Sequence, residues 1–179
     1  MPIVRTMLAL ADVGPQDVVY DLGSGDGRIV IAAAKEFGAR GVGIEIDPAL
    51  VARAEANARD AGVSDRVAFR LGDMYAADLR AATVVTLFLH PQPNLKLRPK
   101  LRSELGPGAR VVSYVWDMGD WTPDEIRRAN GRRIFLWRIR ASVNAWGFLR
   151  RTQSADSVQK NSYKPWNQRM VTVSILGHP

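Results

Sequence analysis

Residues 18–28, Val-Val-Tyr-Asp-Leu-Gly-Ser-Gly-Asp-Gly-Arg, decide how the rest of this chain is interpreted. A short apolar run breaks into a glycine-rich turn, and the turn leads into a helical pattern of apolar residues. Gly23, Gly25 and Gly27 permit positive φ angles and allow a ligand to approach the main chain where a Cβ would clash. We therefore expect a ligand to lie across this turn.

The spacing of the turn argues against a dinucleotide. The dinucleotide fingerprint places its third glycine one residue later, where this chain has Arg28. Asp21 and Asp26 flank the turn, whereas a pyrophosphate prefers a helix N-terminus without nearby carboxylates. Two acids here favour a ligand that carries positive charge and hydroxyl groups, such as a sulfonium nucleoside.

The first 140 residues alternate strand and helix patterns. Strands are expected over residues 18–21, 41–45, 67–71, 82–89 and 109–115, and helices over residues 4–11, 28–37 and 48–61, with another helix opened by Pro99. This alternation predicts an α/β fold with a doubly wound, mostly parallel, Rossmann-like sheet and helices on both faces. The first helix is expected to cover the sheet edge near the ligand.

The chain end is harder to assign. Residues 133–140 are strand-like and are expected to join the sheet antiparallel, paired either with residues 125–129 or with a strand over residues 170–176. Residues 153–168 are polar and suit a loop. We expect one ligand-binding domain over residues 1–140 and a basic, polar extension over residues 141–179 that contributes a strand in the second arrangement.

Acids end three successive strands of the predicted sheet. They are Asp21, Glu45 and Asp73. The carboxyl ends of parallel strands share one edge, so these acids should line a single crevice. Glu45 follows Asp21 by a spacing typical of an acid that accepts hydrogen bonds from a ribose diol.

Residues 21–27, Asp-Leu-Gly-Ser-Gly-Asp-Gly, together with Glu45, resemble the first two motifs of class I S-adenosylmethionine-dependent methyltransferases. The resemblance extends through residues 41–47, 71–74, 84–89 and 107–113. Together these segments are most similar to the small protein-lysine methyltransferases, which include archaeal broad-specificity and mitochondrial enzymes. The resemblance implies a seven-strand sheet, S-adenosyl-L-methionine as the cofactor and direct in-line displacement by the acceptor.

The resemblance also implies site residues. Those expected to bind the cofactor are Asp21, Gly23, Ser24, Gly25, Asp26, Gly27, Glu45, Ile46, Asp73, Met74 and Phe88. Among them, Asp73 would accept from the adenine amino group, with Met74 and Ile46 on either side of the ring. The candidate substrate-lining residues are His90, Asn94, Trp116 and Trp121.

Each substrate-side candidate has a plain alternative. His90 either orients or deprotonates a substrate or is a hydrogen-bonded loop residue. Trp116 and Trp121 either form aromatic walls for a lysine ammonium or pack in the core. Residues 90–94 lack the Asn/Asp-Pro-Pro-aromatic pattern of enzymes that methylate exocyclic base amines. We find no cluster of metal ligands, and in-line displacement requires no metal.

Charge is unevenly distributed along the chain. The net charge is +7, with 9 basic and 12 acidic side chains in residues 1–90 against 16 and 6 in residues 91–179. The basic half suits an acidic protein or nucleic acid partner, or is only a solvated face. The chain has no cysteine, which excludes disulfides and cysteine nucleophiles. No apolar run suits a membrane helix and no secretory signal is evident, so we expect a cytoplasmic protein without membrane partners.

These patterns lead to one main hypothesis, methyl transfer to a protein lysine amine. The alternatives are a methyltransferase that acts on RNA or a small molecule, and a non-catalytic cofactor-binding subunit. The intact set of Asp21, three glycines and Glu45 argues against the last, because a chain that binds no cofactor has no physical need of it.

Overall fold

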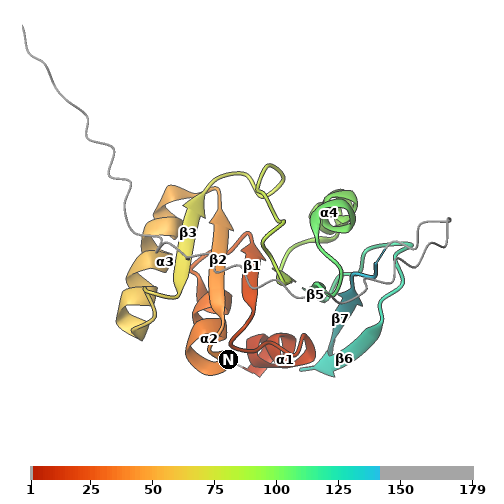
Figure 1. The fold of residues 1–179 in the computed structure, drawn as a ribbon, viewed down its shortest axis with the longest axis horizontal. Helices are drawn as coiled ribbons and strands as arrows, with labels where there is room; N and C mark the ends of the chain where they lie inside the picture. Colours follow the sequence, from red (N-terminus) through yellow and green to blue (C-terminus); the bar gives the residue numbers. More distant parts are fainter. Residues whose placement is uncertain (1, 142–179) are drawn as a thin grey trace, which may run out of the picture. The chain divides into compact units, whose positions relative to one another are not determined.

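The computed structural model describes residues 2–141, in which helices and strands alternate before an antiparallel end (Figure 1). The helices are α1 (Pro2–Leu10), α2 (Arg28–Phe37), α3 (Pro48–Ala61) and α4 (Pro91–Glu104). The strands are β1 (Val18–Leu22), β2 (Arg40–Glu45), β3 (Val67–Leu71), β4 (Val84–Leu87), β5 (Arg110–Tyr114), β6 (Glu125–Ala129) and β7 (Arg132–Arg138).

The seven strands form one sheet in the order β3-β2-β1-β4-β5-β7-β6. The first five strands are parallel to their neighbours, and β7 pairs antiparallel with both β5 and β6. The chain winds outward from β1 in one direction and then restarts at β4 on the other side. The carboxyl ends of β1 and β4 therefore form the topological switch point where doubly wound sheets bind ligands. The predicted fold class is confirmed.

Helices cover both faces of the sheet. Helices α1 and α2 bury Met7, Leu8 and Ile29 against one face, and α3 packs against α2 on the same side. Helix α4 buries Leu97 and Leu101 against the opposite face. In Figure 1, α1 and α4 lie on opposite sides of β5. Both faces of the central strands are therefore buried from solvent, which accounts for their nearly continuous apolar sequences.

Strands β6 and β7 form a tight hairpin. Ala129 pairs with Arg132, and the two residues between them, Asn130 and Gly131, have φ angles of 49° and 73°. Positive φ at both positions is the type I′ turn that matches the natural twist of a hairpin. The pairing of residues 125–129 with 133–140 is thus confirmed as the correct alternative. The strand expected over residues 170–176 lies outside the described residues.

Three local expectations were wrong. Helix α4 begins at Pro91, not at Pro99, which lies inside it. A helix tolerates proline in its first turn, since the N–H groups there have no partner within the helix. The strand expected over residues 82–89 is shorter, because it comprises only Val84–Leu87. Helix α1 packs on the face of the sheet instead of covering its edge.

Candidate functional site

In the glycine turn, Gly27 packs against the sheet and Gly25 faces open space. Gly23, Gly25 and Gly27 have φ angles of 76°, 54° and 79°. A Cβ on Gly27 would lie 2.5 Å from the Phe69 ring, so that glycine permits close packing of the turn on the sheet. A Cβ on Gly25 would meet nothing within 4 Å. Gly25 therefore leaves its main chain open on the side where a ligand approaches.

Glu45 joins this turn to the loop after β2. Its carboxylate accepts from the backbone N–H of Gly25 at 2.8 Å, of Ile46 at 2.8 Å and of Asp47 at 3.1 Å. The side chain is only 9% exposed. A carboxylate has about four acceptor positions, so roughly one remains for a ligand hydroxyl. Glu45 thus holds the turn and the loop after β2 together and keeps acceptor capacity, although it does not line the cavity described below.

Asp21 is the most perturbed acid of the site. It is 2% exposed, and Thr86 Oγ1 donates to its Oδ1 at 2.7 Å. Burial raises the pKa of Asp21 to about 7, and the nearby charges of Glu45 and Asp26 add to the rise, although the Thr86 hydrogen bond opposes it. A cation placed near Asp21 would favour its ionised form.

Asp26 does not contribute free negative charge, contrary to the expectation from the sequence. Arg28 Nε and Nη2 donate to its two carboxylate oxygens at 2.8 and 2.7 Å. These hydrogen bonds lower the pKa of Asp26, and its charge is balanced by Arg28. The attraction for a cationic ligand therefore comes from Asp21 and Glu45.

A cavity of about 570 Å³ opens beside the turn, on the face covered by α1 and α2. Of the expected cofactor-binding residues, it is lined by Asp21, Gly23, Ser24, Gly25, Asp26 and Phe88. Its other lining residues were not expected from the sequence to form the site, and they are Pro2, Ile3, Val4, Arg28, Ile29, Leu50 and Arg53. Leu50 and Arg53 are three apart on α3 and so share one helix face. This spacing predicts that the two side chains lie together, but it does not predict that they line the cavity.

Both backbone polar groups of Ser24 are used within the protein, since its N–H donates to the Ile44 carbonyl at 3.0 Å and its carbonyl accepts from the Gly27 N–H at 2.9 Å. A Cβ built on Gly43 would lie 2.6 Å from Ser24 Oγ, so the hydroxyl is turned toward β2. Ser24 Oγ is buried without a hydrogen-bond partner among the described residues.

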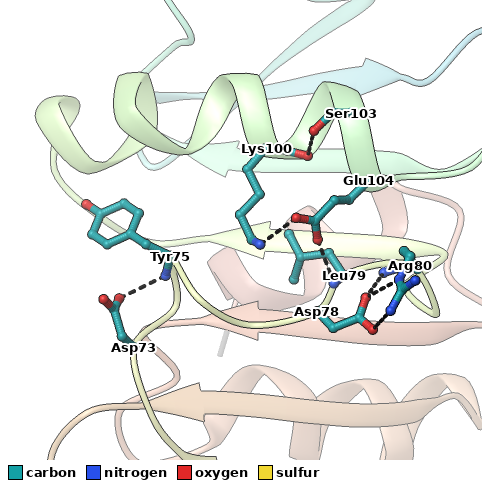
Figure 2. A network of polar contacts seen from close by, with 8 residues as sticks. All are labelled: Asp73, Tyr75, Asp78, Leu79, Arg80, Lys100, Ser103 and Glu104. Atoms are coloured by element: carbon teal, nitrogen blue, oxygen red, sulfur yellow. Dashed lines mark hydrogen bonds and ion pairs between the residues drawn. The ribbon is translucent and has the colours of Figure 1, made fainter.

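The expected adenine contacts lie outside this cavity, at the ends of β2 and β3. Ile46 is 71% exposed, and Met74 is partly buried against the core. Asp73 is exposed, and its Oδ1 accepts from the Tyr75 N–H at 2.8 Å (Figure 2). Its other oxygen carries no hydrogen bond among the described residues. Asp73 therefore shapes its own turn and keeps one acceptor oxygen available.

The loop that carries Asp73 is attached to α4, as Figure 2 shows. Glu104 accepts from the Leu79 N–H at 3.1 Å and from Lys100 Nζ at 2.6 Å. These contacts lower the pKa of Glu104, mainly through the hydrogen bond from Lys100. The segment that follows Asp73 is thus tied to α4 at Leu79.

Two substrate-side candidates lie at the start of α4. His90 is exposed at the N-cap position, where its side chain makes no capping hydrogen bond. Asn94 is fully buried, and its Nδ2 donates to Ser113 Oγ at 2.9 Å and to the Trp116 carbonyl at 3.1 Å. His90 therefore lies at the protein surface and Asn94 in the interior, and neither lines the cavity.

Trp116 follows a strained turn. Its N–H donates to the Tyr114 carbonyl at 3.0 Å, and the residue between them, Val115, has a φ of 72°. This is a γ-turn of the rare positive-φ kind, which is costly for a β-branched residue. Asn94 and Ser113 both donate to the Trp116 carbonyl and so hold the turn. The turn leaves Trp116 41% exposed at the carboxyl edge of the sheet.

Trp121 has a different environment. Its ring lies 5.6 Å from that of Trp137, and its carbonyl accepts from Trp137 Nε1 at 2.7 Å. It packs against the buried cluster beneath α4. Of the two expected aromatic walls, the structure leaves only Trp116 exposed.

These features suit a sulfonium nucleoside. Glu45 provides negative charge, and Asp21 gains it when a cation lies nearby. The open main chain at Gly25 accommodates a close approach, and Glu45 and Asp73 retain acceptor capacity for hydroxyl and amino groups. Apolar residues, among them Ile3 and Phe88, also line the cavity. Among residues 2–141 no group of His, Asp and Glu side chains could hold a metal ion, and no helix is long and apolar enough to cross a membrane.

Comparisons with known proteins show the family of the chain. The family model for the ANTKMT methyltransferase domain matches residues 21–125. A protein-lysine N-methyltransferase of Saccharolobus islandicus is 46% identical over 125 residues, which are 69% of this chain and 78% of that protein. The adenine nucleotide translocase lysine N-methyltransferase of Mus musculus is 37% identical over 78% of this chain, and the chain spans only 60% of its length.

A solved structure from Salinibacter ruber, described as an RNA methyltransferase in complex with S-adenosyl-L-homocysteine, is 56% identical with a TM-score of 0.78. The match covers 80% of this chain and 94% of that one. That structure contains the product left when S-adenosylmethionine has given up its methyl group. The chain belongs to the ANTKMT methyltransferase family, and it is an S-adenosylmethionine-dependent methyltransferase.

Proposed function

We propose that this chain methylates the side-chain amine of a protein lysine. The observation that carries the proposal is the similarity to the Saccharolobus protein-lysine N-methyltransferase, which extends over 78% of that protein. The apolar residues of the cavity lining, among them Ile3, Val4 and Phe88, support it, since they suit a long aliphatic side chain that ends in an amine.

Each residue group has a separate task in this proposal. Glu45 and Asp73 hold the nucleoside part of the donor, and Asp21 offsets its positive charge. The donor, when bound, supplies a methyl group on a sulfonium that an amine displaces directly, so holding the two reactants in line is the main requirement. The cavity walls provide this alignment, and the lysine amine loses its proton to solvent before it attacks.

The location and the charged partner stay proposals. We propose a cytoplasmic protein that approaches an acidic protein surface through the β6–β7 hairpin. Arg128, Arg132 and Arg133 lie at the turn end of that hairpin, which is also the carboxyl edge of β5. Among the described residues none of the three forms an ion pair.

RNA methylation is the second candidate. The similarity to the Salinibacter RNA methyltransferase favours it, and so does the same group of arginines. Phosphate contacts release counterions, so the logarithm of RNA affinity would fall with the logarithm of salt concentration by a slope of about −0.7 per contacted phosphate.

The deciding experiment is methyl transfer from radiolabelled donor into whole-cell extract, followed by separate protease and nuclease digestion. We expect protease to release the label and acid hydrolysis to yield methylated lysines. Label that is lost only on nuclease digestion would replace the lysine proposal by the RNA candidate.

A further inference from the structure

Two stacked aromatic rings stand beside the cavity. Phe88 directly follows β4, and Tyr114 is the last residue of β5. Their ring centroids are 4.6 Å apart and the rings are inclined by 21°. Tyr114 packs against the core under α1, whereas Phe88 lines the cavity and is 50% exposed. The pair is therefore anchored on one side and accessible on the other.

Strand order places the pair on the acceptor side of the donor. Glu45 ends β2 and Asp21 lies in β1, and the next strands across the sheet are β4 and β5. If Glu45 holds the ribose and Asp21 the positive charge, the donor extends from β2 toward β4. Neighbouring strands are about 4.8 Å apart, so Phe88 and Tyr114 lie one to two strands beyond the charged centre.

Three other aromatic rings of the described residues already carry a cation of the chain itself. The cation lies 3.9, 5.7 and 5.0 Å from the ring centroid in the pairs Lys96 over Tyr75, Arg102 over Trp121 and Arg133 over Phe135. Among residues 2–141 no lysine or arginine lies over Phe88 or Tyr114 in this way. The stacked pair that borders the cavity is thus left open to an external cation.

We propose that the Phe88–Tyr114 pair recognises the acceptor by a cation–π contact with the lysine ammonium and with its methylated forms. The proposal rests on lysine methylation being the reaction. A ring face attracts a cation without accepting a specific N–H hydrogen bond. The contact therefore does not hold the proton that must leave to water, and it survives replacement of N–H by N–CH₃. Phe88, expected from the sequence to bind the cofactor, becomes a specificity-determining residue.

The test compares the binding of a cationic probe with that of its neutral isostere. The probes are Nα-acetyl-trimethyllysine amide and the analogue in which carbon replaces the charged nitrogen, each titrated by NMR into the full chain saturated with S-adenosylhomocysteine. We expect the cation to bind about 5-fold more tightly, as a cation–π contact of ordinary strength gives. In Phe88→Leu, which keeps an apolar side chain without a π face, the preference should disappear.

Two controls separate recognition from folding. Phe37→Leu changes a partly buried phenylalanine at the far end of α2 and should retain the preference. Replacing Phe88 by trifluorophenylalanine keeps its shape but weakens the π face, so it should reduce the preference without changing S-adenosylhomocysteine affinity. Equal binding of both probes to the natural protein, or an unchanged preference in Phe88→Leu, would overturn the proposal.

The two proposals fail in different ways. Label on lysine together with no charge preference would remove only the aromatic pair from recognition. Nuclease-sensitive label would remove lysine methylation itself, and the pair would then be tested as a stacking surface for a base. Loss of S-adenosylhomocysteine affinity in Phe88→Leu with the charge preference intact would assign the ring to the donor.

Discussion

Replacing Asp21 by asparagine should stabilise the donor-free protein at neutral pH and above. The folded-state pKa of Asp21 is about 7, whereas its ordinary value is 3.8. Because folding raises this pKa, the unfolded state gives up its proton first as pH rises. Between about pH 4 and pH 7 the natural protein therefore loses stability by up to about 1.4 kcal/mol per pH unit, and the penalty levels off above pH 7.

The shift of the pKa from 3.8 to about 7 lowers the free energy of unfolding by about 4 kcal/mol in total, and Asp21→Asn lacks this loss. The stability difference between variant and natural protein should be about 3 kcal/mol larger at pH 8 than at pH 4.5, measured by urea unfolding without donor. Comparing one variant at two pH values cancels any packing change. Asp78→Asn is the matched control, because exposed Asp78 pairs with Arg80, which lowers its pKa, and so it should show no such gain. A stability difference between Asp21→Asn and the natural protein that does not change with pH would refute the raised pKa of Asp21.

Other perturbations test the same site. Donor affinity should rise as pH increases toward 7, by up to about tenfold per unit, because a bound cation lowers the pKa of Asp21; calorimetry should detect proton release that Asp21→Asn lacks. Glu45→Gln should weaken donor binding by about 10- to 100-fold, as expected for lost hydrogen bonds to a charged group, and calorimetry showing undiminished affinity in a folded variant would exclude Glu45 from the site. Gly25→Ala should block donor binding and cost the protein only the strain of an alanine at positive φ, whereas Gly27→Ala should lower the unfolding temperature much further, because its Cβ also meets a packed ring. Val115→Gly should change the free energy of unfolding by less than about 1 kcal/mol, since relief of the strained φ offsets the lost side chain; a loss above about 3 kcal/mol would contradict strain at this turn.

Local residue chemistry explains why the cofactor turn could be predicted. Gly23, Gly25 and Gly27 satisfy a backbone requirement that few other residues meet, and Glu45 must follow at the end of the next strand. Both constraints act within a short stretch of chain, so the glycine-acid motif can be recognised in the sequence without knowledge of the tertiary structure. The same holds for the hairpin, where Asn130-Gly131 is a strong turn signal that the sequence analysis did not use.

The acceptor side could not be predicted in this way, because it depends on contacts between distant elements. Asn94 follows two prolines in what reads as a loop, yet Pro91 and Pro93 occupy the first turn of α4 and Asn94 is buried against β5. The stack of Phe88 on Tyr114 joins two strands whose neighbourhood follows only from sheet order. Apolar pattern predicts that such residues pack, but not which of them stays accessible.

The three backbone hydrogen bonds to Glu45 have a kinetic consequence. They link the turn after β1 to the loop after β2 through one side chain, so neither can swing open alone. The donor therefore enters a site whose walls are already in place. Stopped-flow association should proceed in a single phase whose rate rises linearly with donor concentration and reaches no plateau, because no slow rearrangement of these two loops precedes or follows capture.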